Sequence, residues 1–202
     1  MLPRFGLALL LAGLGSVPSL AQEASLASVV TFDTVCLQCH EGECSGRLAL
    51  RTEKNPEGVA NHVKGYAGAQ STSTVLELKA LIAGLKRDCR LPPPPVALPP
   101  DGRWTPAMLS ALTLPDQTRL FVPLGVLAPG NQRLSLASAG GAARVRVQVL
   151  AQNFDIVVDE EAALNPGGTV AWRADESSTY FLRLMAKTPL GAVSVSNQSV
   201  AK

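Results

Sequence analysis

The chain has few residues of the kinds that usually carry chemistry or bind large charged partners. Only two of its 202 residues are histidine and four are cysteine, and aromatic residues make up 4% of the chain. Lysine and arginine form no run and the formal net charge is only +2, so the basic patch typical of nucleic-acid-binding proteins is missing. Beyond the N-terminal region, no stretch approaches the roughly 20 consecutive apolar residues of a membrane-spanning helix. We therefore expect neither nucleic-acid binding nor a membrane span.

Two of the four cysteines and one of the two histidines lie together in the run Cys36-Leu37-Gln38-Cys39-His40. Two thiols separated by two residues can lie on one side of a tight helical turn and reach the two vinyl groups on one edge of a porphyrin. The imidazole of the next residue then lies under the iron. This is the Cys-x-x-Cys-His pattern through which haem is covalently attached, so the sequence predicts that Cys36 and Cys39 hold a haem and that His40 binds its iron.

Through this motif, the segment from about Val29 to Arg90 resembles the c-type cytochrome family. The resemblance implies a small all-α haem domain that carries one covalently attached haem c per chain, with His40 as one axial ligand of the iron. It also implies that the haem is attached outside the bacterial inner membrane.

The second axial ligand has few candidates. His62 lies in the segment 61–66, which we expect to form a loop able to fold over the opposite haem face, and a similar histidine is the distal ligand in bis-histidine cytochromes. Met108 and Met185 are the sulfur candidates, but Met108 follows the closing helix, which is the wrong order for the His/Met cytochromes of the resembled family. We predict that His40 and His62 are the axial ligands. With both iron positions filled, the protein is expected to have a low reduction potential and to transfer electrons rather than act as an enzyme.

The first residues have the order of a signal peptide. Met1 to Arg4 supply a positive start, an apolar run follows from Phe5 to Leu14, and small residues end at Ala21. We expect cleavage after Ala21, which makes 1–21 the signal peptide of a periplasmic or secreted protein. In such an oxidising compartment Cys44 and Cys89 could form a disulfide, worth about 3 to 4 kcal/mol in the chain-entropy model. The sequence leaves open whether they do.

The proline-rich segment 92–100 divides the chain. Consecutive prolines lack amide donors and fix their own φ, so a stiff polyproline II linker is expected between a haem domain at 22–91 and a second domain at 101–202. Before the linker, the capping-box spacing of Thr74 and Glu77 predicts a helix from Thr74 to Arg90, with Cys89 turned inward along its apolar face. The candidates for packing against the haem are Phe32, Val35, Tyr66 and Leu81.

After the linker, the pattern changes to alternating apolar and polar residues. It predicts short strands at 118–122, 145–149, 155–158, 169–173, 179–184 and 192–196. Many short strands over about 100 residues favour an antiparallel β-sandwich, so the expected fold class is α+β, in two domains. The strand order is similar to the bacterial pre-peptidase C-terminal type of β-sandwich, and Tyr180–Leu184 matches its late aromatic strand. The sandwich shows no catalytic set, and its expected task is docking to redox partner proteins or self-association.

Other interpretations of the same residues stay open. The Cys-x-x-Cys pair could be a thiol-redox site. A haem with an open sixth position would make the protein a haem enzyme or a gas sensor. The sandwich could itself be the working part, as an adhesion or assembly module with the haem as a structural plug. Zinc could be held by a set drawn from Cys36, Cys39, His40, His62, Cys44 and Cys89, and calcium by the acidic residues Asp155, Asp159, Glu160 and Glu161.

Overall fold

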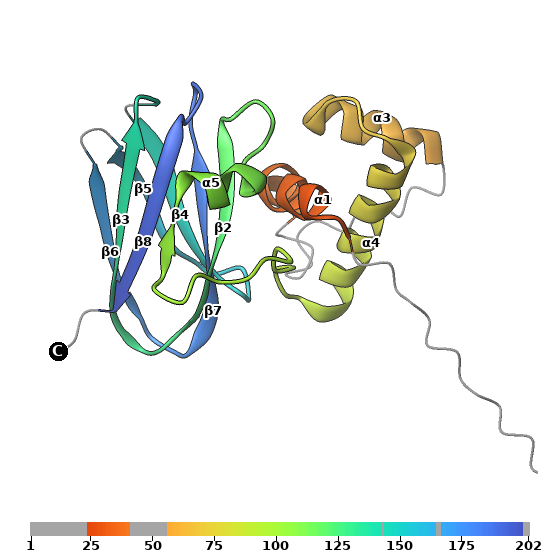
Figure 1. Cartoon of the computed structure of the whole chain (residues 1–202). Coiled ribbons are helices and arrows are strands. Elements are labelled where there is room, and N and C mark those ends of the chain that lie inside the picture. Colours follow the sequence, from red (N-terminus) through yellow and green to blue (C-terminus); the bar gives the residue numbers. More distant parts are fainter. Residues whose placement is uncertain (1–23, 41–55, 143, 165–166, 200–202) are drawn as a thin grey trace, which may run out of the picture.

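The computed structural model describes residues 24–40, 56–142, 144–164 and 167–199. A helical part precedes the proline-rich segment and a β-rich part follows it, so the chain is an α+β protein with the two parts side by side (Figure 1). The expected signal peptide at 1–21 and Cys44 lie outside the described residues. None of the helices in the described ranges is long and apolar enough to span a bilayer.

Within those ranges, eight strands form two antiparallel sheets of four strands each. The strands are β1 (Arg103–Trp104), β2 (Arg119–Leu127), β3 (Gly130–Ala139), β4 (Arg144–Ala151), β5 (Ile156–Ala163), β6 (Gly168–Ala174), β7 (Ser178–Met185) and β8 (Ala192–Ser199). One sheet has the order β1-β8-β3-β6, and the other has the order β2-β7-β4-β5. The expectation of a β-rich part built from antiparallel strands is confirmed.

The two sheets bury one apolar core between them. Leu134 and Val195 come from one sheet, and Leu120 and Val147 come from the other. Side chains alternate between the two faces of a strand, so the core-facing residues recur at every second position. In β3, for example, Gln132, Leu134, Leu136 and Ser138 are buried. This is the layer arrangement of a β-sandwich.

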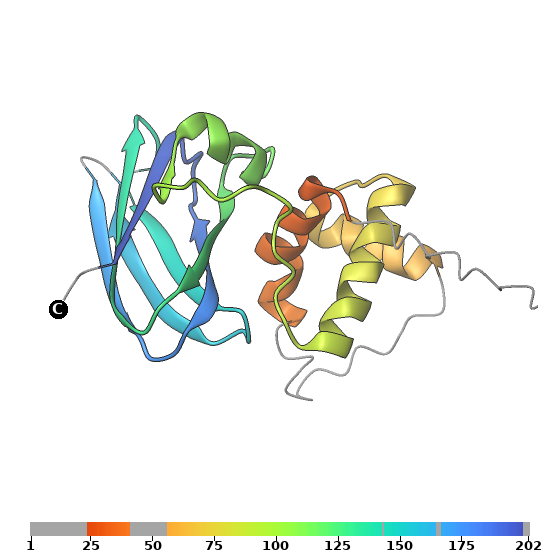
Figure 2. The same ribbon diagram turned by 60° about the horizontal axis from the view of Figure 1, so that its bottom comes forward.

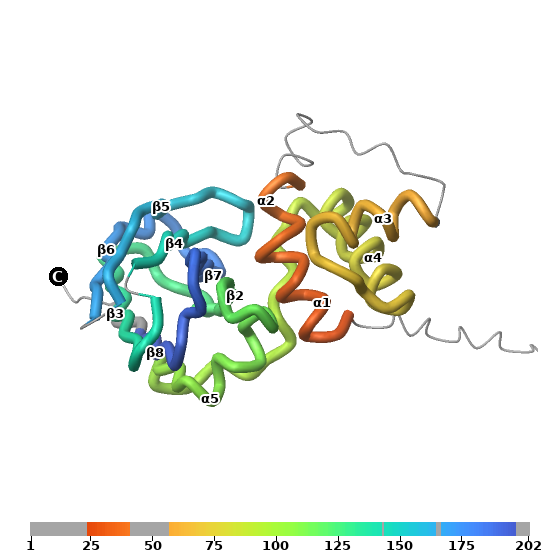
Figure 3. Tube along the Cα trace, turned by 90° about the horizontal axis from the view of Figure 1, so that it is seen from above, coloured from red at the N-terminus to blue at the C-terminus, as the bar shows by residue number. Residues whose placement is uncertain are grey.

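The helical part consists of α1 (Leu26–Thr31), a π-helical turn (Phe32–Cys36), α2 (Leu37–His40), α3 (Pro56–Ala67) and α4 (Thr72–Asp88). The first three follow one another without a break. We call this continuous rod, Leu26–His40, the motif helix because it carries the Cys-x-x-Cys-His run. It lies between the sandwich and α4 (Figures 1 and 3), and its α1 portion packs on α4. Two short helical turns, α5 (Pro106–Leu109) and a 3-10 turn (Ser110–Leu112), lead into β2.

The middle strands of the sheet β2-β7-β4-β5 are packed against other elements on both faces. Its inner face meets the other sheet, and its outer face carries Phe121, Leu150 and Phe181. These three side chains lie in one buried cluster with Phe32 and Leu37 of the motif helix. Phe121 and Phe181 stack with their ring centres 5.3 Å apart. The motif helix is therefore docked on the sandwich through apolar contacts.

The proline-rich segment forms neither helix nor strand, but it is fastened to the sandwich. Immediately before it, the Leu91 backbone N–H donates to the Gln152 carbonyl oxygen at 2.9 Å, and the Leu91 side chain is fully buried in the cluster that contains Phe121. Further along, Val96 packs against the sandwich core. Figure 2 follows this segment from the end of α4 across to the sandwich. The connection therefore packs along the protein instead of holding its two parts at a distance.

Helix α4 begins two residues earlier than predicted. Its N-cap is Ser71, whose Oγ accepts a hydrogen bond from the Thr74 backbone N–H at 3.1 Å. The expected capping partner, Glu77, instead accepts hydrogen bonds from the backbone N–H and the Oγ of Ser25 at 2.9 and 2.6 Å. Ser25 is the N-cap of α1, so Glu77 joins the start of the motif helix to α4. The hydrogen bonds from Ser25 lower the pKa of the Glu77 carboxyl.

Truncation of Phe121 tests the docking of the two parts. We expect Phe121→Ala to lower the free energy of unfolding by about 3 to 5 kcal/mol, because a fully buried ring at the junction is lost. The measurement is urea unfolding followed by circular dichroism. Val126→Ala, on the same strand but 71% exposed, is the matched control and should change stability by about 0.5 kcal/mol or less. Equal effects of the two variants would contradict the docking.

Candidate functional site

A π-helical turn comes immediately before the Cys-x-x-Cys-His run. The Leu37 backbone N–H bonds to the Phe32 carbonyl oxygen, five residues back, so this turn holds one more residue than an α-helical turn. Such turns occur frequently at functional sites. The Thr34 carbonyl oxygen in this turn accepts hydrogen bonds from the side chains of Gln38 and Arg119, at 2.6 and 3.5 Å. Arg119 belongs to β2, so this contact also ties the turn to the sandwich.

Cys36 and Cys39 both carry free thiols, as covalent attachment of haem requires. Cys36 is half-buried against the apolar cluster, whereas Cys39 is exposed. Burial, together with the smaller effects of the charges of Asp33 and Cys39, raises the pKa of the Cys36 thiol to about 11. At neutral pH Cys36 is therefore a protonated thiol rather than a reactive thiolate.

The structure brings the two predicted axial ligands together from two different helices. His40 ends α2 and is 7% exposed, whereas His62 lies within α3 and is exposed. Their ring centres are 6.2 Å apart, and the angle between the ring planes is 67°. The predicted loop at 61–66 is wrong, because these residues belong to α3, which packs on α4 and on the π-helical turn.

This spacing fits two imidazoles on opposite sides of one metal ion. Metal–nitrogen bonds to histidine are about 2.0 to 2.1 Å long, and a ring centre lies about 1.1 Å beyond its nitrogen, which places two such rings about 6.2 to 6.4 Å apart. Any angle between the planes is compatible, because each ring can turn about its own metal–nitrogen bond. An edge-to-face pair of aromatic rings has a similar geometry. The spacing of His40 and His62 is therefore compatible both with a pair of iron ligands and with direct packing of the two rings.

The surroundings of the two histidines also suit an apolar macrocycle. Val59 of α3, together with Leu81 and Ile82 of α4, packs against the buried cluster while staying partly exposed. These partly exposed apolar side chains lie on the helix that carries His62 and on the helix that packs against it, and they offer a surface that a porphyrin would cover. The donor set and its apolar setting therefore fit a covalently bound haem.

The four residues predicted to pack against the haem have different environments. Phe32 is fully buried within the core, whereas Val35 and Leu81 are half-buried. Tyr66 is 67% exposed and contacts the His62 ring, with ring centres 4.9 Å apart and an angle of 47° between the planes. Tyr66 is therefore placed to limit the rotation of His62 rather than to fill the interior.

Two buried charged residues, which the sequence analysis did not single out, lie near each other where the motif helix meets the sheet. Asp33, in the π-helical turn, is fully buried, and its carboxylate oxygens have no hydrogen-bond partner among the described residues. Burial raises the pKa of the Asp33 carboxyl well above its usual range, and the positive charge of Arg183 opposes that shift. Arg183, on β7, is 2% exposed. The sequence holds two signals for this pair: Asp33 interrupts the apolar stretch 29–37, and Arg183 interrupts the apolar strand segment Tyr180–Leu184.

Cys89 does not face inward as predicted. It is the C-cap residue of α4, in the left-handed conformation with φ of 45°, and it is exposed, so the helical spacing on which the prediction relied no longer applies there. Cys89 is disulfide-bonded. Its predicted partner Cys44 lies outside the described residues, so the pairing stays a prediction.

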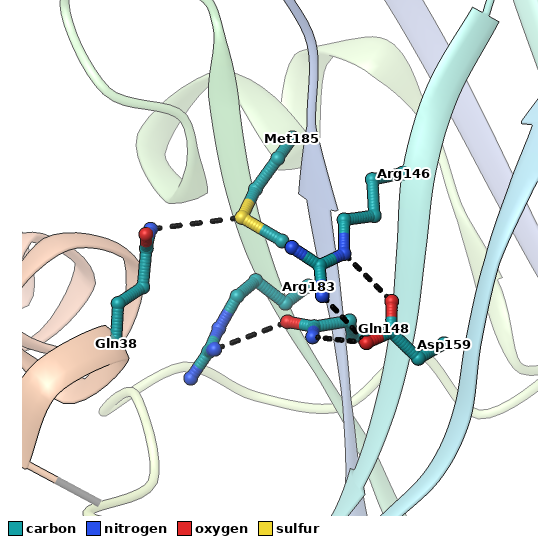
Figure 4. Close-up of polar contacts among 6 residues, drawn as sticks. All are labelled: Gln38, Arg146, Gln148, Asp159, Arg183 and Met185. Atoms are coloured by element: carbon teal, nitrogen blue, oxygen red, sulfur yellow. Dashed lines mark hydrogen bonds and ion pairs between the residues drawn. The ribbon is translucent and has the colours of Figure 1, made fainter.

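The two methionines considered as alternative ligands lie in different places. The Met185 Sδ accepts a hydrogen bond from Gln38 Nε2 at 3.6 Å, so this residue lies beside the motif (Figure 4). Met108 is on α5 and is 38% exposed. Of the two methionines, Met185 therefore lies next to the Cys-x-x-Cys-His run, although it is 147 residues from Gln38 in the sequence.

The described part of the chain contains no group of three or more His, Cys, Asp or Glu residues arranged to hold a metal ion. Neither the zinc nor the calcium hypothesis gains support there. Three of the acidic residues considered for calcium lie in β5, where Asp159 pairs with Arg146 at 2.6 Å and Glu161 pairs with Arg144 at 3.6 Å. Such opposite charges on neighbouring strands stabilise the pairing of β4 and β5.

Comparison with known proteins does not identify a family. No family model matches the chain, and no curated protein matches it. Among solved structures, the chain is similar to a protein from Bacteroides thetaiotaomicron assigned as an alpha-L-fucosidase, with 13% identity and a TM-score of 0.31. The match covers 66% of this chain and 28% of that chain. A likeness at this level carries no argument about function.

The different environments of the two thiols can be measured in haem-free protein. We expect iodoacetamide to modify Cys39 much faster than Cys36 at about pH 8, because Cys36 is half-buried and remains protonated there. Peptide mapping by mass spectrometry after timed exposure gives the two rates. In urea the rates should become similar, which controls for local sequence effects. Equal rates in the folded protein would contradict the burial of Cys36.

Proposed function

We propose that this chain is an exported c-type cytochrome that carries single electrons through one haem c, bound covalently by Cys36 and Cys39. His40 and His62 would be the axial ligands of the iron. The observation that carries the proposal is the 6.2 Å spacing of the two imidazole rings, beside two free thiols. A bound haem supplies an iron that changes between the ferric and ferrous states while keeping its ligands.

The chain holds the proposed site from two sides. The motif helix supplies both thiols and the buried His40, and its position is set by packing between the sheet and α4. Helix α3 supplies His62, and the buried Val63 anchors this helix to the same apolar cluster. Together α1, α2, α3 and α4 would form the small all-α haem domain implied by the motif. Two nitrogen ligands favour the ferric form, so a lower reduction potential than that of His/Met cytochromes is expected.

The position of His62 favours an electron carrier over a haem enzyme or a gas sensor. An open sixth coordination position requires that no ligating side chain lie opposite His40. Here the second imidazole is at a distance that suits coordination and is held by a helix rather than by a loop. A substrate or a gas would have to displace this side chain, which is why we propose a carrier and not an enzyme.

The sandwich is proposed to support the haem segment and to offer a surface to redox partner proteins or to a second copy of the chain. Its outer face already packs against the motif helix through Phe121, Leu150 and Phe181. The signal-peptide pattern of residues 1–21 supports a periplasmic or secreted location, which is where haem is attached in the family that the motif resembles.

Loss of His62 tests the ligand assignment. In haem-loaded His62→Ala, we expect the ferric iron to change from low-spin to high-spin and the ferrous iron to bind carbon monoxide, because one axial nitrogen is missing. Absorption and paramagnetic-resonance spectra of the purified protein report both changes. An unchanged spin state would remove His62 from the site.

The matched control for this variant is Lys64→Ala. Lys64 lies on the same helix and is exposed, so its removal should leave the iron low-spin. If both variants turn high-spin, the change reports a disturbed α3, and the assignment of His62 as a ligand loses its support.

Covalent attachment is tested by replacing both thiols. Haem should stay with the wild-type polypeptide in acidified organic solvent and should be extracted from the Cys36→Ala/Cys39→Ala variant, because thioether bonds do not dissociate. Intact-protein mass spectrometry gives an independent measure of the attached group, and Cys89→Ala is the control that should keep it. A colourless wild-type protein from cells with active haem-attachment machinery would overturn the proposed function.

A further inference from the structure

The Asp33 carboxyl is a buried titratable group that has no role in the proposed binding of haem. It lies three residues before Cys36, in the π-helical turn, and it is fully buried. Its two oxygens lack hydrogen-bond partners among the described residues. Its charge acts on the Cys36 thiol, which places the carboxyl beside the attachment turn. A charge in this low-dielectric position responds strongly to other charges nearby.

A row of polar side chains leads from Arg183, whose charge acts on Asp33, to the protein surface. Arg183 on β7, Gln148 on β4 and Asp159 on β5 are direct partners on adjacent strands, so their side chains lie on the same face of the sheet. Arg183 Nη1 donates to Gln148 Oε1 at 3.1 Å, and Gln148 Nε2 donates to Asp159 Oδ2 at 3.1 Å (Figure 4). Exposure rises from 2% for Arg183 and 4% for Gln148 to 36% for the Asp159 side chain. Polar side chains therefore extend from Arg183, the charged neighbour of the buried carboxyl, to the solvent-exposed Asp159.

Several other ionisable groups lie on the elements around Asp33. The π-helical turn packs against α1, α2, α3 and β2, and β7 supplies Arg183. Helix α1 carries no ionisable side chain. The others are Cys36 in the turn itself, Cys39 and His40 on α2, Glu57, His62, Lys64 and Tyr66 on α3, Arg119 on β2, and Tyr180 and Arg183 on β7. Arg183 is the group whose charge acts on Asp33, and histidines that bind a metal do so as neutral rings.

We propose that Asp33 is a proton-binding site coupled to electron transfer at the haem, with Arg183 as its charged neighbour and with Gln148 and Asp159 leading from Arg183 to the surface. This inference rests on the proposed function. On reduction of the protein by a one-electron donor, the Asp33 carboxylate would take up one proton from solvent, and on oxidation it would release that proton. The coupling has a simple electrostatic cause: reduction removes one positive charge, so the neighbouring carboxylate is less stabilised and holds a proton more tightly.

The experiment is a titration of the midpoint potential of the haem-loaded protein from about pH 4 to about pH 9. The wild-type potential should fall as the pH rises, by up to about 59 mV per pH unit where one proton accompanies one electron. Asp33→Asn should lose this dependence and have the higher potential at high pH, because the negative charge is gone. Glu160→Gln, an exposed carboxyl on β5, is the matched control and should keep the wild-type slope.

A second measurement covers the case in which Asp33→Asn does not fold. Infrared difference spectra of reduced minus oxidised wild-type protein should show a protonated carboxyl band that shifts when aspartate is isotopically labelled. Absence of that band, a wild-type potential independent of pH, or a slope that persists in Asp33→Asn would each overturn this inference and leave the proposed function standing. Protein without attached haem would instead overturn the proposed function.

Discussion

Burial of the motif helix on both sides is the constraint on which the rest of the structure depends. One side of this helix meets Phe121 and Phe181 on the outer face of a sheet, and its α1 portion packs on α4. A helix this short is not stable alone in water, because nucleation is costly and most helical stability in proteins comes from tertiary packing. The positions of both thiols and of His40 are therefore set by contacts that lie far away in the sequence, in the sandwich and in α4.

His62 lies on α3, a helix with fewer stabilising contacts than the motif helix. Helix α3 has few apolar anchors, chiefly Val63, with Val59 and Ala67 partly buried. Its own glycines, Gly58 and Gly65, each cost stability within a helix relative to alanine. The His62 side is consequently the more easily displaced half of the site, whereas the His40 side is fixed by the core. A bound group that joined the two histidines would stabilise α3 most.

The sequence could predict the strands but not the docking. The strand positions follow from alternation and the six predicted strands are present, whereas the haem chemistry of the motif stays a prediction. Strand β3 has no β-branched residue among Gly130–Ala139, so its pattern did not indicate a strand. The segment of His62 does carry Val59, Val63 and Ala67 at helical spacing, a signal for α3 that the loop prediction overlooked. The runs Leu120-Phe121-Val122 and Tyr180-Phe181-Leu182 are apolar on both faces of their strands, which is typical of a sheet covered on both sides. They could have indicated that something packs on the sandwich, but not that the partner is the motif helix.

The buried pair of Asp33 and Arg183 is poorly explained by stability. A buried polar group left without a hydrogen bond costs about 1 to 3 kcal/mol, and replacing a buried ion pair by apolar residues of similar size is often neutral or stabilising. Apolar residues surround this position, since Phe32 and Leu37 on the same helix are fully buried. An apolar residue at position 33 would suit that cluster better than a carboxyl. What the carboxyl adds is a group that can gain or lose a proton one turn before the first thiol, so we expect it to act on the electrostatics of the proposed haem site rather than on the fold.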